Sequence, residues 1–136
     1  MFMSSLASAQ TPKEFAFLGE KSWAAFECSS LSSMMKNRYE QDRLFAIAYE
    51  AGKKYIIAAK SGKLNIEEMN SDIYSDFAAA MSGPSIDFML GRVYEVATRE
   101  ATKNIFAAPN GSLHSEKLIK TFALANYVQK DCKNLH

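Results

Sequence analysis

The sequence predicts an all-α protein, folded as one bundle of about four to six helices. Three observations lead to this prediction. Apolar residues recur at spacings of three and four in several long segments. No segment shows the apolar-polar alternation of a half-buried strand. The six glycines and three prolines lie mostly between the periodic segments, as expected for long elements joined by short connections.

Length and composition suit a single globular domain. A chain of 136 residues with 48% hydrophobic content can bury roughly two thirds of its unfolded surface, enough for a core without a structural metal. Sixteen basic and fifteen acidic residues give a net charge of +1, which is not the basic footprint of a nucleic-acid-binding protein. The longest apolar runs fall well short of the roughly 18 residues that cross a bilayer. We therefore expect no nucleic-acid partner, no membrane insertion and a single helical domain over residues 11–136.

Residues 1–10 are predicted to be the remnant of a signal peptide or a disordered N-terminus. The triplet Ala7-Ser8-Ala9 has the small-residue pattern of a cleavage site, and cleavage there would leave Gln10 at the start of the mature chain. These ten residues carry no basic segment of the kind that opens a signal peptide. A signal-peptide remnant would place the protein in the periplasm or outside the cell.

The first two helices have clear sequence signals. Thr11 and Glu14 have the spacing of a capping box, and Pro12 occupies the first helical position. The expected core-facing stripe of this helix comprises Phe17, Ala24, Ala25, Cys28, Leu31 and Met35. The second helix, roughly residues 39–60, has the most regular stripe, formed by Leu44, Ile47, Ala48, Ala51, Tyr55, Ala58 and Ala59. Gly62 can take the left-handed conformation that follows a helix.

Further helices are expected after residue 64. Asn65 and Glu68 have capping spacing and open one or two short helices that include Phe77. Ser85 caps the next helix, whose stripe is Ile86, Met89, Leu90, Val93, Ala97, Ala101 and Ile105. The last helix is expected over about residues 113–134, and its core-facing stripe comprises Leu118, Phe122, Ala125, Val128 or Gln129, and Cys132.

The two cysteines are predicted to form one disulfide between the first and last long helices. Cys28 and Cys132 fall on core-facing stripes, so a bond between them requires those helices to pack side by side. Closing a loop of about 100 residues corresponds to about 4–5 kcal/mol in a chain-entropy treatment. The alternative is two buried free thiols. Disulfide and export support each other, because cytosolic thiols are kept reduced.

Catalytic and metal-binding patterns are weak. His114 is expected in the first turn of the last helix, where it is interpreted as a surface residue rather than a base. Cys132 and His136 are four apart on a helix, but structural zinc needs about four ligands. We predict no catalytic residue, no metal and no cofactor.

Candidate binding residues come from an excess of aromatic side chains. Nine phenylalanines, six tyrosines and one tryptophan exceed what a small helical core readily buries, so some are expected on a surface that binds a partner. The candidates from this set are Trp23, Tyr49 and Tyr55. Asp87 and Arg92 are added from the helix that begins after Ser85, whose free backbone amides can face an anion.

Three segments resemble small exported helical proteins in their layout, namely SWAAFECSSL, RLFAIAYEAGKKYI and FALANYVQKDC. They combine a tryptophan near an early cysteine, a Tyr-x-x-Gly element from Tyr49 to Gly52, and a late cysteine. HdeA-type acid-stress chaperones and the immunity proteins of type VI secretion amidases share that layout. This chain differs by the helix after Ser85 and lacks the second cysteine pair of many immunity proteins. The resemblance implies an exported protein-binding chain and assigns no binding residue.

The sequence thus favours a small exported binding protein that occludes a protein partner, such as a toxin, a hydrolase or an envelope protein, without chemistry of its own. The first alternative is an HdeA-like periplasmic chaperone that opens in acid by protonation of carboxylates, since the chain has only two histidines. The second is an enzyme, which a deep pocket joining His114 to carboxylates would indicate. The oligomeric state, a dimer included, is left open.

Overall fold

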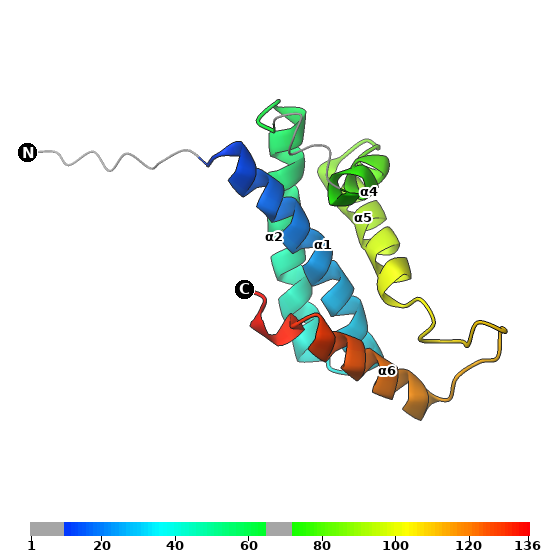
Figure 1. Ribbon diagram of the computed structural model, residues 1–136. Helices are drawn as coiled ribbons and strands as arrows, with labels where there is room; N and C mark the ends of the chain where they lie inside the picture. Colours follow the sequence, from blue (N-terminus) through cyan, green and yellow to red (C-terminus); the bar gives the residue numbers. More distant parts are fainter. Residues whose placement is uncertain (1–9, 65–71) are drawn as a thin grey trace, which may run out of the picture.

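In a computed structural model, the described residues 10–64 and 72–136 form five α-helices and one 3-10 turn, with no strand among them (Figure 1). The elements are α1 (Pro12–Met34), α2 (Arg38–Lys60), α4 (Asp72–Ala80), α5 (Ile86–Ala101), α6 (Glu116–Gln129) and η1 (Cys132–Asn134). The predicted all-α bundle is confirmed. Within this part of the chain, no helix has the length and hydropathy needed to cross a membrane. The predictions for residues 1–9 and for the capping pair Asn65 and Glu68 lie outside the described residues.

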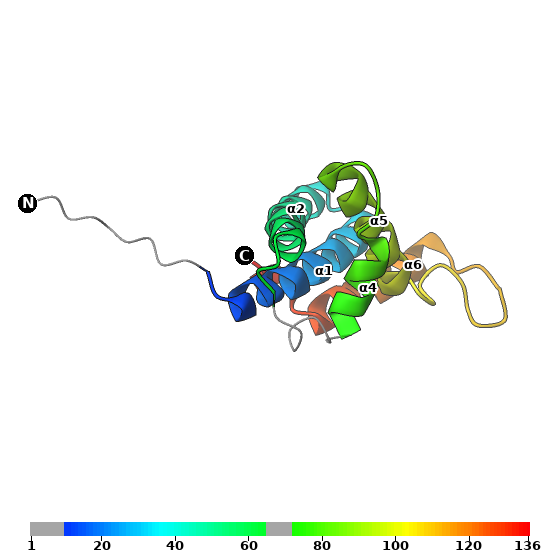
Figure 2. The same ribbon diagram turned by 90° about the horizontal axis from the view of Figure 1, so that it is seen from above.

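The helices α1 and α2 form an antiparallel pair that runs the length of the molecule (Figures 1 and 2). The predicted capping box starts α1, where the Glu14 amide donates to the Thr11 hydroxyl over 3.2 Å. The pair packs closely because small residues face each other. The Ser22 hydroxyl donates to the Ala48 carbonyl over 2.7 Å, and a Cβ on Gly52 would lie 2.5 Å from the Ser22 Oγ. Gly52 is therefore required by this close approach.

Buried serines line the inner face of α1. The hydroxyl of Ser29 donates to the Gln41 carbonyl over 2.9 Å, and that of Ser32 donates to the Cys28 carbonyl over 2.9 Å. Ser30 shares a hydrogen bond of 2.6 Å with Thr98 on α5. Each buried hydroxyl thus has a partner, which removes most of the free-energy cost of burying it.

The core has two parts, arranged along α1. One lies among α1, α2, α4 and α5 and includes Phe26, Ile56, Phe77 and Val93. The other contains Cys28, Leu31, Leu44, Ala101, Ile105, Ala123 and Cys132. The prediction that Phe17 faces the core is wrong, because its side chain is 62% exposed. The C-terminal segment covers α1 at Cys28 but does not cover Phe17. Phe17 lies on the edge of an open hollow that Ala24 and Leu135 also line.

The last helix differs from its prediction in length and in orientation. α6 ends at Gln129, and the chain turns at Asp131, a non-glycine residue with a φ of 55°. Cys132 therefore lies in η1 and not on the stripe of α6. Ala123 is the buried residue of α6, with Ile119 and Tyr127 partly buried beside it. The expected core residues of α6 are instead exposed, namely Leu118, Phe122, Ala125, Val128 and Gln129.

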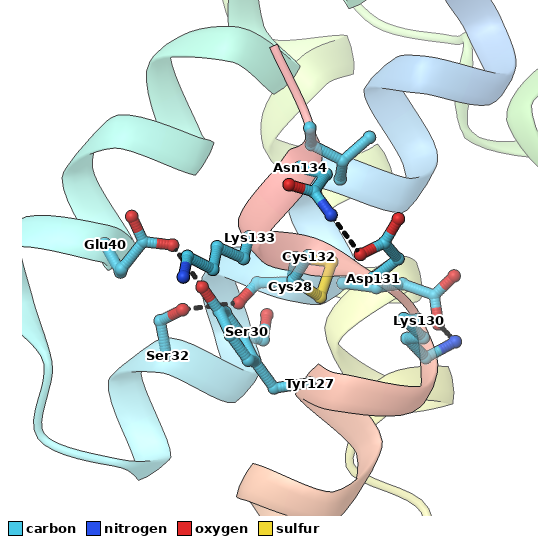
Figure 3. Close-up of a disulfide and its surroundings, with 12 residues drawn as sticks. Cys28, Ser30, Ser32, Glu40, Tyr127, Lys130, Asp131, Cys132, Lys133 and Asn134 are labelled. Atoms are coloured by element: carbon cyan, nitrogen blue, oxygen red, sulfur yellow. Dashed lines mark hydrogen bonds and ion pairs between the residues drawn. A yellow bond between two sulfur atoms is a disulfide. The ribbon is translucent and has the colours of Figure 1, made fainter.

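The predicted disulfide is present between Cys28 on α1 and Cys132 in η1 (Figure 3). The two Cα atoms are 5.6 Å apart and both side chains are fully buried. The bond links α1 to the turn that follows α6, which is a correction to its expected place within the last helix. Free cysteines are absent from the described residues.

Candidate functional site

A small aromatic pocket lies between α2 and α5 and contains two of the predicted binding residues. Its volume is about 110 Å³. The lining residues are Phe26, Phe45, Tyr49, Asp87, Leu90, Gly91 and Tyr94. Small-molecule sites are usually about 300–1,000 Å³, so this pocket is smaller than a typical small-molecule site.

The pocket's aromatic rings support one another. Phe26, Phe45 and Tyr94 form three edge-to-face pairs, with centroid separations of 5.7, 5.5 and 5.7 Å. Tyr49 stacks on Phe45 with a separation of 6.4 Å. Such pairs contribute about 0.5–1.5 kcal/mol each beyond their buried area, so the rings hold the pocket in one shape.

One carboxylate gives the pocket its charge. The Tyr49 hydroxyl donates to the Asp87 carboxylate, which projects from the first turn of α5. This hydrogen bond is the main reason that the pKa of Tyr49 is raised, followed by desolvation and by the charges of Asp87 and Glu50. Asp87 is the one charged residue among those that line the pocket. The site is therefore an aromatic surface with a single negative charge.

The other predicted binding residues lie elsewhere. Trp23 and Tyr55 are only 7% and 2% exposed, and both rings pack on Phe77 of α4. Their expected role at a partner-binding surface is corrected to a role in the core. Arg92 donates to the carbonyl and the hydroxyl of Ser82, so it fixes the connection between α4 and α5. Of the five candidates, Tyr49 and Asp87 meet at the aromatic pocket.

A second surface is the outer face of α6, defined by Leu118, Phe122, Leu124, Ala125 and Val128, all of which are exposed. Among the described helices, α6 packs against α1, and its Tyr127 also reaches Glu40 of α2. Phe106 and Leu113, from the connection that precedes α6, are also exposed. The face thus presents apolar side chains over consecutive turns, and Phe122 is partly covered by His114 from that connection.

The sequence predicts His114 in the first turn of the last helix. In the structure it lies instead in the connection before α6. Its Nδ1 is 2.7 Å from the Ile105 carbonyl oxygen, and its ring is 5.1 Å from that of Phe122. The hollow that His114 lines has a volume of about 350 Å³, and the described residues around it include no carboxylate. No group of three or more potential metal ligands occurs in the described part of the chain.

A set of polar contacts, which we call the C-terminal clasp, anchors the end of the chain. It comprises Glu27, Glu40, Arg43, Tyr127 and Lys130. The Arg43 guanidinium donates to the Leu135 carbonyl over 2.6 Å, to the Cys132 carbonyl over 3.2 Å and to the Glu40 carboxylate over 2.6 Å. Tyr127 also donates to Glu40, and Lys130 pairs with Glu27 over 3.0 Å (Figure 3). The hydrogen bond from Arg43 is the main reason that the pKa of Glu40 is lowered.

Five residues that line the aromatic pocket were not among the predicted binding residues, namely Phe26, Phe45, Leu90, Gly91 and Tyr94. Phe45 and Tyr94 lie off the predicted stripes of their helices, and nothing in the spacing of the sequence pairs them. Gly91 could have been identified from the sequence, because an isolated glycine inside a helix usually has a packing or functional reason. Arg43 was also missed, since Glu40 and Arg43 at a spacing of three look like an ordinary surface pair.

Comparisons of this chain with protein-family models, with curated proteins and with solved structures found no match. The similarity in layout to HdeA-type chaperones and to amidase immunity proteins therefore stays a prediction.

Proposed function

We propose that this chain is an exported, non-catalytic protein-binding module, which acts by covering a surface of a partner protein with the outer face of α6. The observation that carries the proposal is the exposure of five apolar side chains over consecutive turns of one helix. Contiguous apolar patches on soluble proteins commonly mark interaction sites. An amphipathic helix that places its apolar face in a partner's groove is a common mode of recognition.

The attachment of α6 supports this role. The helix contributes one fully buried side chain, Ala123, to the core. The C-terminal clasp and the disulfide fix its end to α1 and α2. A rigidly held helix loses little conformational entropy on binding, which favours affinity. The outer face is thus both apolar and preorganised.

The disulfide supports a periplasmic or secreted location. Structural disulfides persist in oxidising compartments and are rare in the cytosol. The Cys28–Cys132 bond spans 104 residues and is fully buried. We therefore assign the proposed binding function to a compartment outside the cytosol.

Affinity capture from an envelope extract, with wild-type chain and two matched variants, tests the proposal. Phe122→Glu places a charge on the outer face of α6, whereas Ile57→Glu places the same charge on an exposed apolar position of α2. We expect a partner that is captured by the wild type and by Ile57→Glu, and lost with Phe122→Glu. Equal capture by all three chains would overturn the proposal. So would a wild-type homodimer that Phe122→Glu dissociates in sedimentation equilibrium, because the face would then bind a second copy.

An acid-stress chaperone of the HdeA type is a second candidate, and the C-terminal clasp favours it. Two carboxylates, Glu40 and Glu27, hold the C-terminal segment through Arg43 and Lys130. Protonation of Glu40 would weaken its contact with Arg43 and loosen the segment to which α6 is attached. Binding of a surface-hydrophobicity dye between pH 7 and pH 2 tests this candidate. A reversible rise in fluorescence at acid pH is expected of a chaperone, and a flat signal contradicts it.

A further inference from the structure

We propose that the aromatic pocket between α2 and α5 binds the guanidinium group of an arginine side chain from a partner. This inference rests on the proposed binding function, because the partner supplies the arginine. It concerns a different surface from the outer face of α6. The two can therefore be tested separately.

The lining of the pocket selects a cation. Four aromatic rings and one carboxylate surround it, and no lysine or arginine is among the lining residues. Aromatic faces attract cations through their quadrupole, and the attraction strengthens when the cation is desolvated. Glu50, whose charge also acts on the Tyr49 hydroxyl, adds a second negative group near the site. An anionic or neutral polar group would gain neither contact.

Among cations, guanidinium matches this lining best. It is planar, weakly hydrated and able both to stack on a ring and to donate hydrogen bonds to a carboxylate. A lysine ammonium is more strongly hydrated, so it loses more on entering an apolar pocket. A quaternary ammonium has no proton to donate to Asp87. A carboxylate has about four acceptor positions, and Tyr49 uses one of those on Asp87.

Gly91 supplies an independent argument for an occupant. Glycine is unfavourable inside a helix relative to alanine. Gly52 has a structural reason to be glycine, because its Cβ would collide with Ser22 and Leu90. A Cβ at Gly91, in the middle of α5, would meet no atom within 4 Å. Gly91 is exposed and lines the pocket, so the missing side chain leaves space for a group from outside.

The test is a titration of the full chain with N-acetyl-arginine methylamide. Binding is monitored through the NMR signals of Gly91 and of the Tyr49 and Tyr94 rings. The citrulline analogue, a neutral molecule of the same shape, and the lysine analogue serve as matched ligands. We expect saturable shifts with arginine and about tenfold weaker binding of both controls, because citrulline has no charge and the lysine ammonium loses more hydration on entering the pocket. Citrulline binding as tightly as arginine would overturn the charge argument. Lysine binding as tightly would overturn the assignment to guanidinium.

Three variants locate the site. Asp87→Asn removes the charge and keeps the shape, and we expect it to weaken arginine binding about fivefold to tenfold. Gly91→Leu places a bulky side chain at a residue that lines the pocket and is expected to weaken arginine binding, and Gly91→Ala repeats the test with a smaller side chain should the leucine variant fail to fold. The proposal would be refuted if Asp87→Asn, or Gly91→Leu that folds, bound arginine with unchanged affinity.

A further variant, Phe122→Glu, separates this inference from the proposed function. It alters the outer face of α6 and should bind the arginine probe as the wild type does. Loss of partner capture with normal probe binding shows that α6 carries the function and that the pocket is a separate site. If the chain binds the arginine probe and Phe122→Glu leaves partner capture unchanged, the pocket is supported and the proposed role of α6 is overturned. Absence of arginine binding in the wild type overturns the pocket alone.

Discussion

The α1–α2 pair and α6 are held to the same molecule by different forces. The pair is joined along its length by buried side chains, close small residues and hydroxyl-to-carbonyl hydrogen bonds. α6 has one fully buried residue and is anchored near its C-terminal end by a disulfide and a few polar contacts. Periodicity therefore correctly indicates the buried face of α2 and misassigns that of α6. A helix that is tethered can leave its apolar face free for another molecule, whereas a helix that is packed cannot.

The largest effect is expected on removing the disulfide. The double variant Cys28→Ala with Cys132→Ala, or reduction of the wild type, should lower the free energy of unfolding by up to about 4–5 kcal/mol, the value for a loop of this length. Hydrogen exchange should show that protection falls more in residues 116–134 than in α2, because α6 has little else to hold it. An equal loss of protection in both regions would mean that α6 is as well packed as the pair.

Two phenylalanines give the next largest effect and a direct comparison of the regions. Phe26, which is 1% exposed, packs inside the first core, whereas Phe122 is 37% exposed on the outer face of α6. Phe26→Ala should destabilise the fold by about 3–5 kcal/mol, since it leaves a cavity. Denaturant unfolding at neutral pH measures this change. A loss below about 1 kcal/mol would show that the first core is not the main source of stability.

The C-terminal clasp should contribute less, and in a pH-dependent way. Glu40→Gln is expected to lower the free energy of unfolding by about 1–3 kcal/mol at pH 7, through loss of hydrogen bonds to a charged group. The pKa of Glu40 is below its usual 4.5 in the folded chain. Its contribution is therefore fully present above about pH 4.5 and is lost as the pH falls through the lower, folded-state pKa.

Stability curves of wild type and Glu40→Gln should accordingly converge in acid. Glu95→Gln serves as the control, because the Glu95 side chain is 74% exposed and pairs only with exposed Arg99. We expect this control to change stability by less than about 0.5 kcal/mol at any pH. A constant difference between wild type and Glu40→Gln from pH 7 to pH 3 would contradict the role assigned to the Glu40 charge.

The smallest effect on stability is expected on the outer face of α6. Phe122→Ala removes the same side chain as Phe26→Ala, yet it should lower the free energy of unfolding by at most about 1 kcal/mol, because the ring is partly in water already. Thermal unfolding of both variants in one buffer makes the comparison. A loss as large as that of Phe26→Ala would place Phe122 in the core and remove the free face from which the binding function is argued.

Much of the fold follows from local sequence signals. The capping box at Thr11, the cap at Ser85 and the stripe of α2 depend on residues within one or two turns of each other, so the sequence contains the information. The pairing of Cys28 with Cys132 was also predicted, because two cysteines allow only one intramolecular bond. For the candidate site, Tyr49 and Asp87 were predicted separately as binding residues. Their meeting at one pocket depends on the packing of α2 against α5, which the sequence does not show.

The sequence by itself determined the helical class and the start of the first helix, which follow from short-range spacing, and it limited any intramolecular disulfide to Cys28 with Cys132. Tertiary structure alone decided which aromatic rings are buried, as Trp23 and Tyr55 are, and which line a pocket, as Tyr49 does. It also decided the direction of α6, because the left-handed turn at Asp131 separates Cys132 from the helix. Periodicity shows that a helix has an apolar face, but the neighbours that cover that face are set by contacts between distant parts of the chain.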